Sequence, residues 1–362
     1  MYKILGGLLF VFLLLLPQDA FSQPKKLVAV LAFKNLTGDT SLDYICSGFG
    51  ETLTTKLFKV KELELIERMQ LIKVLEEQKL QLSGLVDEKS AVKAGKLFGV
   101  QYVIIGSIQK AGSALKADTR LISVATGKIE AANDVAGNYE NMFSLQEELA
   151  LKLIKSFGIS PTEKERVEIV KKPTESLSAY EWYAKGISFF EKSQYNDAIK
   201  CFKTAIDLDK SYVEAITYLG ESYSVKSLFD EAMGAYRKAL SIYGDKGDES
   251  GRAKVYIKVG ELYIQKGNYD TALEYLEKSL KIAEKLGDES IIADALGDMG
   301  TAYAYKRKFK KALAYFEDAL KLYERLGKER EIATSSKIYD FIIAIIDNFV
   351  NLTWFSMSIY AF

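Results

Sequence analysis

The residue types that carry most catalytic and metal-binding chemistry are scarce in this sequence. Its 362 residues contain no histidine and only two cysteines, Cys46 and Cys201. Without histidine there are no Ser-His or Cys-His nucleophile pairs and no imidazole metal ligands. The two cysteines are too few for a thiolate cluster, and we expect both to be buried as small apolar residues, with a bridge between them as the minor alternative. We therefore expect no enzyme, no metal and no cofactor.

The remaining motifs that could bind a nucleotide are incomplete. Gly48-Phe-Gly50 is followed by Leu53, where a dinucleotide loop needs a third glycine, and Gly95-Lys96 lacks the other residues of a phosphate loop. Acidic pairs such as Glu76-Glu77 occupy surface-helix positions, where solvation is the default. Lys plus Arg equals Asp plus Glu at 49 each, so no net positive charge draws the chain to nucleic acid.

The first 22 residues have the pattern of a secretory signal peptide. Lys3 precedes an apolar run from Leu5 to Leu16, and small residues follow at Ala20 and Ser22. The run is shorter than the roughly 20 residues that a membrane-spanning helix needs, so an uncleaved anchor is the weaker interpretation. We expect cleavage before Gln23 and a periplasmic protein, with a peripheral place at the outer membrane as a further possibility.

Prolines divide the mature chain into domains. None lies within 25–160 or 174–362, and the charged stretch 161–178 reads as an exposed linker. The segment 25–160 alternates short apolar runs with helical periodicity, which predicts an α/β domain with a mixed sheet and flanking helices. The expected strands are 27–33, 63–66, 102–109, 115–124 and 128–137, and the expected helices are 42–58, 69–79, 87–99 and 141–157.

This order of segments resembles a known envelope domain. The stretches VAVLAFKNLTGD (28–39), LDYICSGFGETLTTKL (42–57), LIERMQLIKVLEE (65–77), AVKAGKLFGVQYVIIGSI (91–108) and RLISVATGKIEAA (120–132) resemble the CsgG-like and TolB amino-terminal-like domains. The resemblance implies an extracytoplasmic interaction domain, and some relatives assemble into an outer-membrane secretion pore. This chain has no lipoprotein cysteine, and its connections 110–113 and 125–127 are too short for additional membrane hairpins.

The second half is a repeat array. Glycines at 186, 220, 260 and 300 are separated by 34, 40 and 40 residues, and each is followed twelve residues later by alanine and sixteen residues later by a bulky residue. Small residues let paired helices approach while bulky ones fill the space beside them. The recurrence resembles tetratricopeptide repeats (TPRs), which implies an all-α solenoid of four repeats over 179–330.

In such a solenoid the first helix of each pair supplies most of the concave face. Carried over from the resemblance, this face is aromatic at one end and partly acidic at the other, and it lacks the cluster of Lys, Arg and Asn that clamps a C-terminal carboxylate. We predict a groove for a protein or peptide partner. The predicted groove residues are Tyr180, Tyr183, Ile187, Phe190, Tyr218, Glu221, Ile257, Glu261, Asp294, Asp298 and Tyr305, with Glu214, Thr217, Lys254, Lys258, Ile264, Gly297 and Thr301 at the other positions of this face.

The segment 331–362 departs from the repeat pattern. We expect a final helix in which Ile342, Ile345 and Ile346 pack on the fourth repeat, and residues 348–362 carry no charge. This apolar tail could pack back on the repeats, lie on a membrane or contact a partner. The leading functional hypothesis is a non-enzymatic periplasmic scaffold that binds envelope proteins through the groove. The alternative is a subunit or accessory of a curli-type outer-membrane secretion complex.

Overall fold

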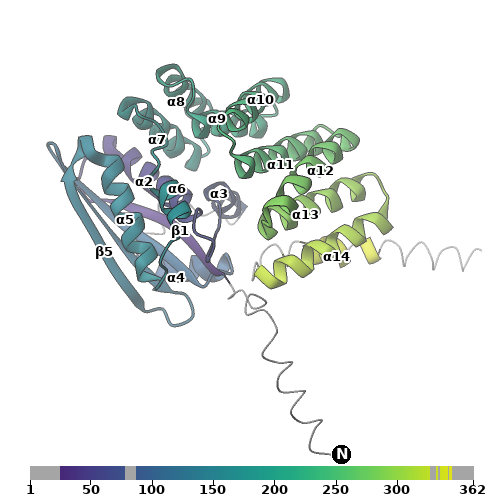
Figure 1. The fold of residues 1–362 in the computed structure, drawn as a ribbon, viewed down its shortest axis with the longest axis horizontal. Helices are drawn as coiled ribbons and strands as arrows, with labels where there is room; N and C mark the ends of the chain where they lie inside the picture. The colour runs from purple at the N-terminus through teal and green to yellow at the C-terminus, as the bar shows by residue number, and fades with distance from the viewer. Residues whose placement is uncertain (1–24, 78–86, 327–331, 333–334, 341, 345–362) are drawn as a thin grey trace, which may run out of the picture.

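The computed structural model describes residues 25–77, 87–326, 332, 335–340 and 342–344. An α/β domain at the N-terminus lies against a curved array of paired helices (Figure 1). This confirms the expected fold class. The predicted signal peptide and the apolar tail 348–362 lie outside the described residues.

The α/β domain is built on a five-stranded mixed sheet with the order β2-β1-β3-β4-β5. β1 pairs in parallel with β2 and β3, whereas β3, β4 and β5 form an antiparallel meander. Gly127, with a φ of +68°, lies in the predicted turn between the last two strands. The strands are β1 (Lys26–Asn35), β2 (Leu63–Leu65), β3 (Tyr102–Ala111), β4 (Ala114–Ser123) and β5 (Ile129–Asn138).

Helices cover both faces of this sheet, and the alternation of side chains along β1 shows how. Val28 and Val30 pack in one core with α2 (Asp43–Leu57) and α5 (Met142–Ser156). Leu27, Ala29 and Leu31 pack in a second core with α3 (Arg68–Glu77) and α4 (Glu88–Leu97). The Asp87 carboxylate caps α4, as its sequence position predicts. Short 3-10 helices occupy Thr40–Leu42 and Tyr139–Asn141.

The stretch expected to be an exposed linker is partly helical. Residues Glu163–Val170 form α6, which begins with a capping box between Thr162 and Glu165. Ile169 is fully buried, and its carbonyl accepts a hydrogen bond from Lys56 Nζ at 2.5 Å. The predicted linker thus contains a helix that contacts the domain through Ile169, while Glu163, Lys164, Arg166 and Val167 of this helix are exposed.

The four repeats are pairs of antiparallel helices. Gly220 lies so close to its partner helix that a Cβ there would be 2.6 Å from Tyr236, and at Gly260 it would be 2.7 Å from Leu276. The glycine and the bulky residue sixteen positions later are thus in direct contact, which is the physical basis of the repeat signal. The pairs are α7 (Leu177–Glu191) with α8 (Tyr195–Leu208), α9 (Val213–Val225) with α10 (Phe229–Asp245), α11 (Glu249–Gln265) with α12 (Tyr269–Leu286), and α13 (Glu289–Tyr305) with α14 (Phe309–Leu326).

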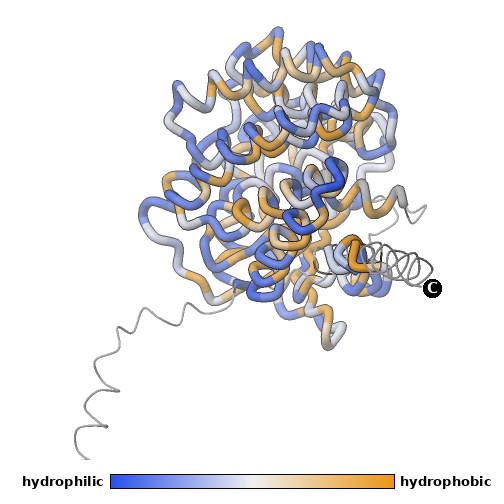
Figure 2. The backbone as a smooth tube through the Cα atoms, turned by 90° about the vertical axis from the view of Figure 1, so that its right-hand side faces the viewer, coloured by the Kyte–Doolittle hydropathy of each residue, from blue (hydrophilic) through white to orange (hydrophobic). Residues whose placement is uncertain are grey.

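Beyond α14, residues 335–340 and 342–344 are helical. Ile342 is buried with Ala312 and Phe316, which confirms that this segment packs on the fourth repeat, whereas Ile345 and Ile346 lie outside the described residues. Hydrophobic and hydrophilic residues alternate along the backbone (Figure 2). Among the described residues, no helix is both long and apolar enough to cross a membrane. Cys46 and Cys201 are both buried and unbridged, as expected, and burial raises the pKa of Cys46 to about 12.

Candidate partner-binding groove

The concave face of the first two repeats is covered by the N-terminal domain. Helix α2 lies against α7, and the predicted groove residues there are between 0 and 5% exposed. The Tyr183 ring lies 4.9 Å from Tyr212 and 5.9 Å from Tyr218, centroid to centroid. This part of the groove therefore packs within the chain, and a role in partner binding stays a prediction. The covered predicted residues are Tyr180, Tyr183, Ile187, Phe190 and Tyr218.

Small residues on α2 allow this close approach. A Cβ on Gly48 would lie 2.7 Å from the Cβ of Ala184 and 2.8 Å from the hydroxyl of Tyr180. A Cβ on Gly50 would lie 2.6 Å from Arg68 Nη1. The glycines of the incomplete nucleotide motif thus have a packing role, one at the contact between the domains and the other beside the Arg68 side chain.

A buried ion pair joins the domains beside this contact. Arg68 Nε donates to Glu191 Oε1 at 2.5 Å, and Ser47 Oγ donates to Glu191 Oε2 at 2.7 Å. The side chains of Arg68 and Glu191 are 2% and 12% exposed. Glu51 is buried nearby, and burial raises its pKa to about 7 although Arg68 and a hydrogen bond from Tyr218 act in the opposite direction.

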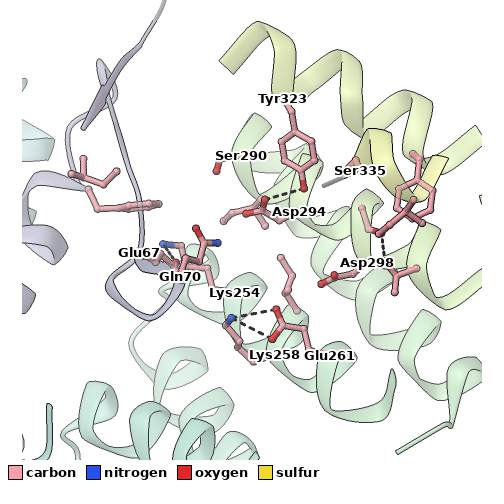
Figure 3. Close-up of a pocket in the computed structure, with 18 residues that line it drawn as sticks. Glu67, Gln70, Lys254, Lys258, Glu261, Ser290, Asp294, Asp298, Tyr323 and Ser335 are labelled. Atoms are coloured by element: carbon pink, nitrogen blue, oxygen red, sulfur yellow. Dashed lines mark hydrogen bonds and ion pairs between the residues drawn. The ribbon is translucent and has the colours of Figure 1, made fainter. Parts of the chain in front are cut away.

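The third and fourth repeats line an open cavity of about 260 Å³, which we call the groove cavity (Figure 3). Lys258 Nζ lies 3.3 Å from Glu261 Oε1, and Lys254 Nζ lies 3.2 Å from Glu67 Oε1 of the N-terminal domain. Tyr323 OH donates to Asp294 Oδ1 at 3.2 Å. Four predicted groove residues line this cavity: Ile257, Glu261, Asp294 and Asp298.

The groove cavity has walls from three parts of the chain. Phe58, Glu67 and Gln70 come from the N-terminal domain, and Ser335 and Ile338 come from the helix beyond α14. The sequence analysis did not predict these residues, because they precede or follow the repeats. Their only signal was the position of Glu67 and Gln70 at the polar start of a predicted helix.

Acidic side chains outnumber basic ones around the groove cavity. Glu67, Glu261, Asp294 and Asp298 face two lysines, Lys254 and Lys258. Burial alone would lower the pKa of Lys258, but Glu261 and Glu221 raise it well above its usual value, so this lysine stays charged. The lining keeps a formal charge of −2, which favours a partner segment with positive charge.

The remaining two predicted groove residues, Glu221 and Tyr305, also lie outside the groove cavity. Glu221 is buried, and its carboxylate lies 3.5 Å from Lys258 Nζ. Tyr305 is 61% exposed at the end of α13, where its ring stacks on Tyr269 at a centroid distance of 5.5 Å. Glu221 therefore contacts a lysine that lines the cavity, and Tyr305 is an exposed residue that does not line it.

Comparisons with known proteins agree with this division of the chain. Residues 15–117 match the family model for the curli production assembly/transport component CsgG. Residues 212–285 and 251–325 match a tetratricopeptide-repeat model, and residues 186–224 match a second TPR model.

Similarity to individual proteins is partial. A putative adenylate cyclase 3 of Rhizobium meliloti is 27% identical over 146 residues, which are 40% of this chain and 23% of that protein. Protein bimA of Emericella nidulans is 35% identical over 65 residues, which are 18% of this chain and 8% of that protein. The chain therefore spans less than a quarter of the length of these relatives.

Among solved structures, the apo form of RapI is 20% identical with a TM-score of 0.45, covering 60% of this chain and 63% of that one. The domain assignment rests on the family models and the observed helix pairs. The chain thus joins a CsgG-like N-terminal domain to an array of tetratricopeptide repeats, and it has the organisation of a protein-interaction scaffold.

Proposed function

We propose that this protein is a non-enzymatic periplasmic scaffold that holds a basic segment of an envelope protein in the groove cavity. The observation that carries the proposal is the convergence of Ile257, Glu261, Asp294 and Asp298 on one open, acidic cavity. Two aspartates lie one helical turn apart on α13, so an extended segment with lysine or arginine side chains would meet both.

Two further features support this proposal. The sequence contains no histidine, which removes the Ser-His and Cys-His nucleophile pairs. The CsgG match and the signal-peptide pattern favour an envelope location. An accessory role in a curli-type secretion complex is the alternative, and it is favoured by the same CsgG match.

The test is co-purification from the envelope fraction with two matched double variants. Asp294→Asn/Asp298→Asn removes two negative charges from the groove cavity, and Glu274→Gln/Glu277→Gln removes two from the exposed face of α12. We expect the wild type and the α12 variant to recover the same partner, identified by mass spectrometry, and the cavity variant to lose at least ten-fold. Equal recovery with both variants would reject the groove cavity as the binding site. Recovery of curli-secretion proteins with the wild type would support the alternative.

A further inference from the structure

A second cavity lies between the domains, away from the groove cavity. It has a volume of about 90 Å³ and is formed where α2 and the segment 171–173 meet helices α7, α9 and α10. None of its lining residues also lines the groove cavity. It adjoins a cavity of about 190 Å³, with which it shares Glu51, Glu214 and Tyr243.

The floor of this interdomain cavity carries buried oxygen atoms without partners. Glu51 is 9% exposed and Tyr212 is 0% exposed, yet Glu51 Oε2 and the Tyr212 hydroxyl make no hydrogen bond with any described residue. The same holds for Oε2 of Glu214, whose side chain is half-buried. Buried polar atoms are nearly always paired. A donor-rich group inside the cavity would satisfy two carboxylates and one hydroxyl together.

The buried Lys56 also lines the cavity, and its Nζ donates to the carbonyl oxygens of Ile169 and Lys171. Glu51 and Tyr212 lie at the buried floor, whereas Lys246 is exposed and Lys59 is half-buried. Lys59, Lys246 and Glu214 all line this cavity. Burial raises the pKa of Glu214, the charges of Lys246 and Lys59 oppose that rise, and the charge of Asp248 adds to it. A simple polycation would meet repulsion from the lysines. A molecule with an ammonium group at one end and a carboxylate at the other matches both the acidic groups at the floor and the lysines Lys59 and Lys246.

We propose that the interdomain cavity binds a small free amino acid. Its ammonium group donates to Glu51, Glu214 and Tyr212, and its carboxylate faces Lys59 and Lys246. Because Glu51 belongs to the N-terminal domain and Glu214 to the second repeat, the ligand contacts both domains and stabilises their docked arrangement.

The experiment titrates the chain from residue 23 to 362 with glycine, L-alanine and β-alanine at pH 8, followed by calorimetry and by the melting temperature. N-acetyl-alanine and propylamine are the control ligands, since each lacks one of the two charges. We expect saturable binding of at least one amino acid with a rise in melting temperature, and at least ten-fold weaker binding of both controls.

Variants separate this cavity from general effects. Glu51→Gln and Glu214→Gln should each weaken binding at least ten-fold, and Lys246→Gln several-fold, while Glu231→Gln on the exposed face of α10 should leave it unchanged. Melting curves without ligand show that each variant is folded, and the exposed Lys246 provides a variant that leaves the buried floor intact. Absence of saturable binding at millimolar concentration, equal binding of N-acetyl-alanine, or full binding by the folded Glu51, Glu214 and Lys246 variants would overturn the proposal. The groove cavity is tested separately by Asp294→Asn/Asp298→Asn, because neither aspartate lines the interdomain cavity or the cavity of about 190 Å³ that adjoins it.

Discussion

At the scale of single residues, the centre of the molecule is a small group of charged side chains between the domains. Arg68 of the N-terminal domain and Glu191 of the first repeat form a buried ion pair, and Glu51 lies beside them. Removing one partner of such a pair typically costs about 3–5 kcal/mol, because the other charge stays buried. These residues therefore fix how the domains are docked.

The buried Glu51 gives stability a defined pH dependence. Its pKa is about 7 in the folded protein against 4.5 when exposed, so ionisation is harder in the folded state and stability falls as pH rises through this window. The difference corresponds to about 3 kcal/mol. Between pH 4.5 and 8, the wild type should lose about 3 kcal/mol more of its free energy of unfolding than Glu51→Gln loses, as measured by urea denaturation. Arg68, Glu67, Glu191 and Tyr218 face this carboxyl and remain unchanged in the variant. The same pH dependence in both proteins would contradict the burial of an ionisable Glu51.

Single residues also show what the sequence could and could not predict. Gly220 and Tyr236 belong to one repeat, so their regular spacing revealed the contact. Arg68 and Glu191 are 123 residues apart and belong to different domains, and no periodicity relates them. The predicted groove residues lie on the first helix of each pair. The presence of α2 over Tyr183 and Tyr218 depends on domain docking, which the repeat pattern does not encode.

At the scale of elements, the contact between α2 and α7 decides the arrangement. Its sequence signal is the set of small residues Ser47, Gly48 and Thr52 on α2, which has no repeat or periodic pattern that would identify the partner helix. Gly48→Leu should overpack this contact and cost about 1–3 kcal/mol or separate the domains. Thermal denaturation and small-angle scattering measure the two outcomes.

The matched control for that substitution is Gly234→Ala in α10, where nothing lies within 4 Å of the added Cβ. It should raise stability by about 0.5–1 kcal/mol, because alanine is the better helix former. If Gly48→Leu were as stable as Gly234→Ala, with an unchanged radius of gyration, α2 would not be packed against α7.

The segment beyond α14 is a second element with a testable role. Ile342 packs with Phe316 and Ala312, so Ile342→Ala should cost about 2–5 kcal/mol. A chain ending at residue 330 should lose the fourth repeat at lower temperature than wild type, whereas a chain ending at 347 should stay folded and be more soluble. If the chain ending at residue 347 had an unfolded repeat array, residues 348–362 would belong to the core.

At the scale of the whole molecule, the docked domain divides the repeat array into two parts. Repeats one and two pack against α2, and repeats three and four keep an open acidic cavity whose far wall is the N-terminal domain. Both domains therefore contribute to the wall of the groove cavity. A partner bound in the groove cavity, as proposed, would contact both of them.

The proposed periplasmic location rests on the signal-peptide pattern of the first 22 residues. The full chain should be recovered from the periplasmic fraction with Gln23 at its N-terminus, while a chain lacking residues 2–22 should stay in the cytoplasm. Cell fractionation with N-terminal sequencing measures both. Retention of the full chain in the cytoplasm would rule out the proposed periplasmic role.

The most direct test of the scaffold account is photo-cross-linking in the cell from a benzoylphenylalanine placed at Thr301, which lines the groove cavity. The same probe at Glu277, on the exposed face of α12, is the control position. If the protein is a scaffold, the probe at position 301 should give a protein adduct and the probe at position 277 should not. The adduct from position 301 should be lost when Asp294→Asn/Asp298→Asn is added. No adduct from position 301, or the same adduct from both positions, would contradict it.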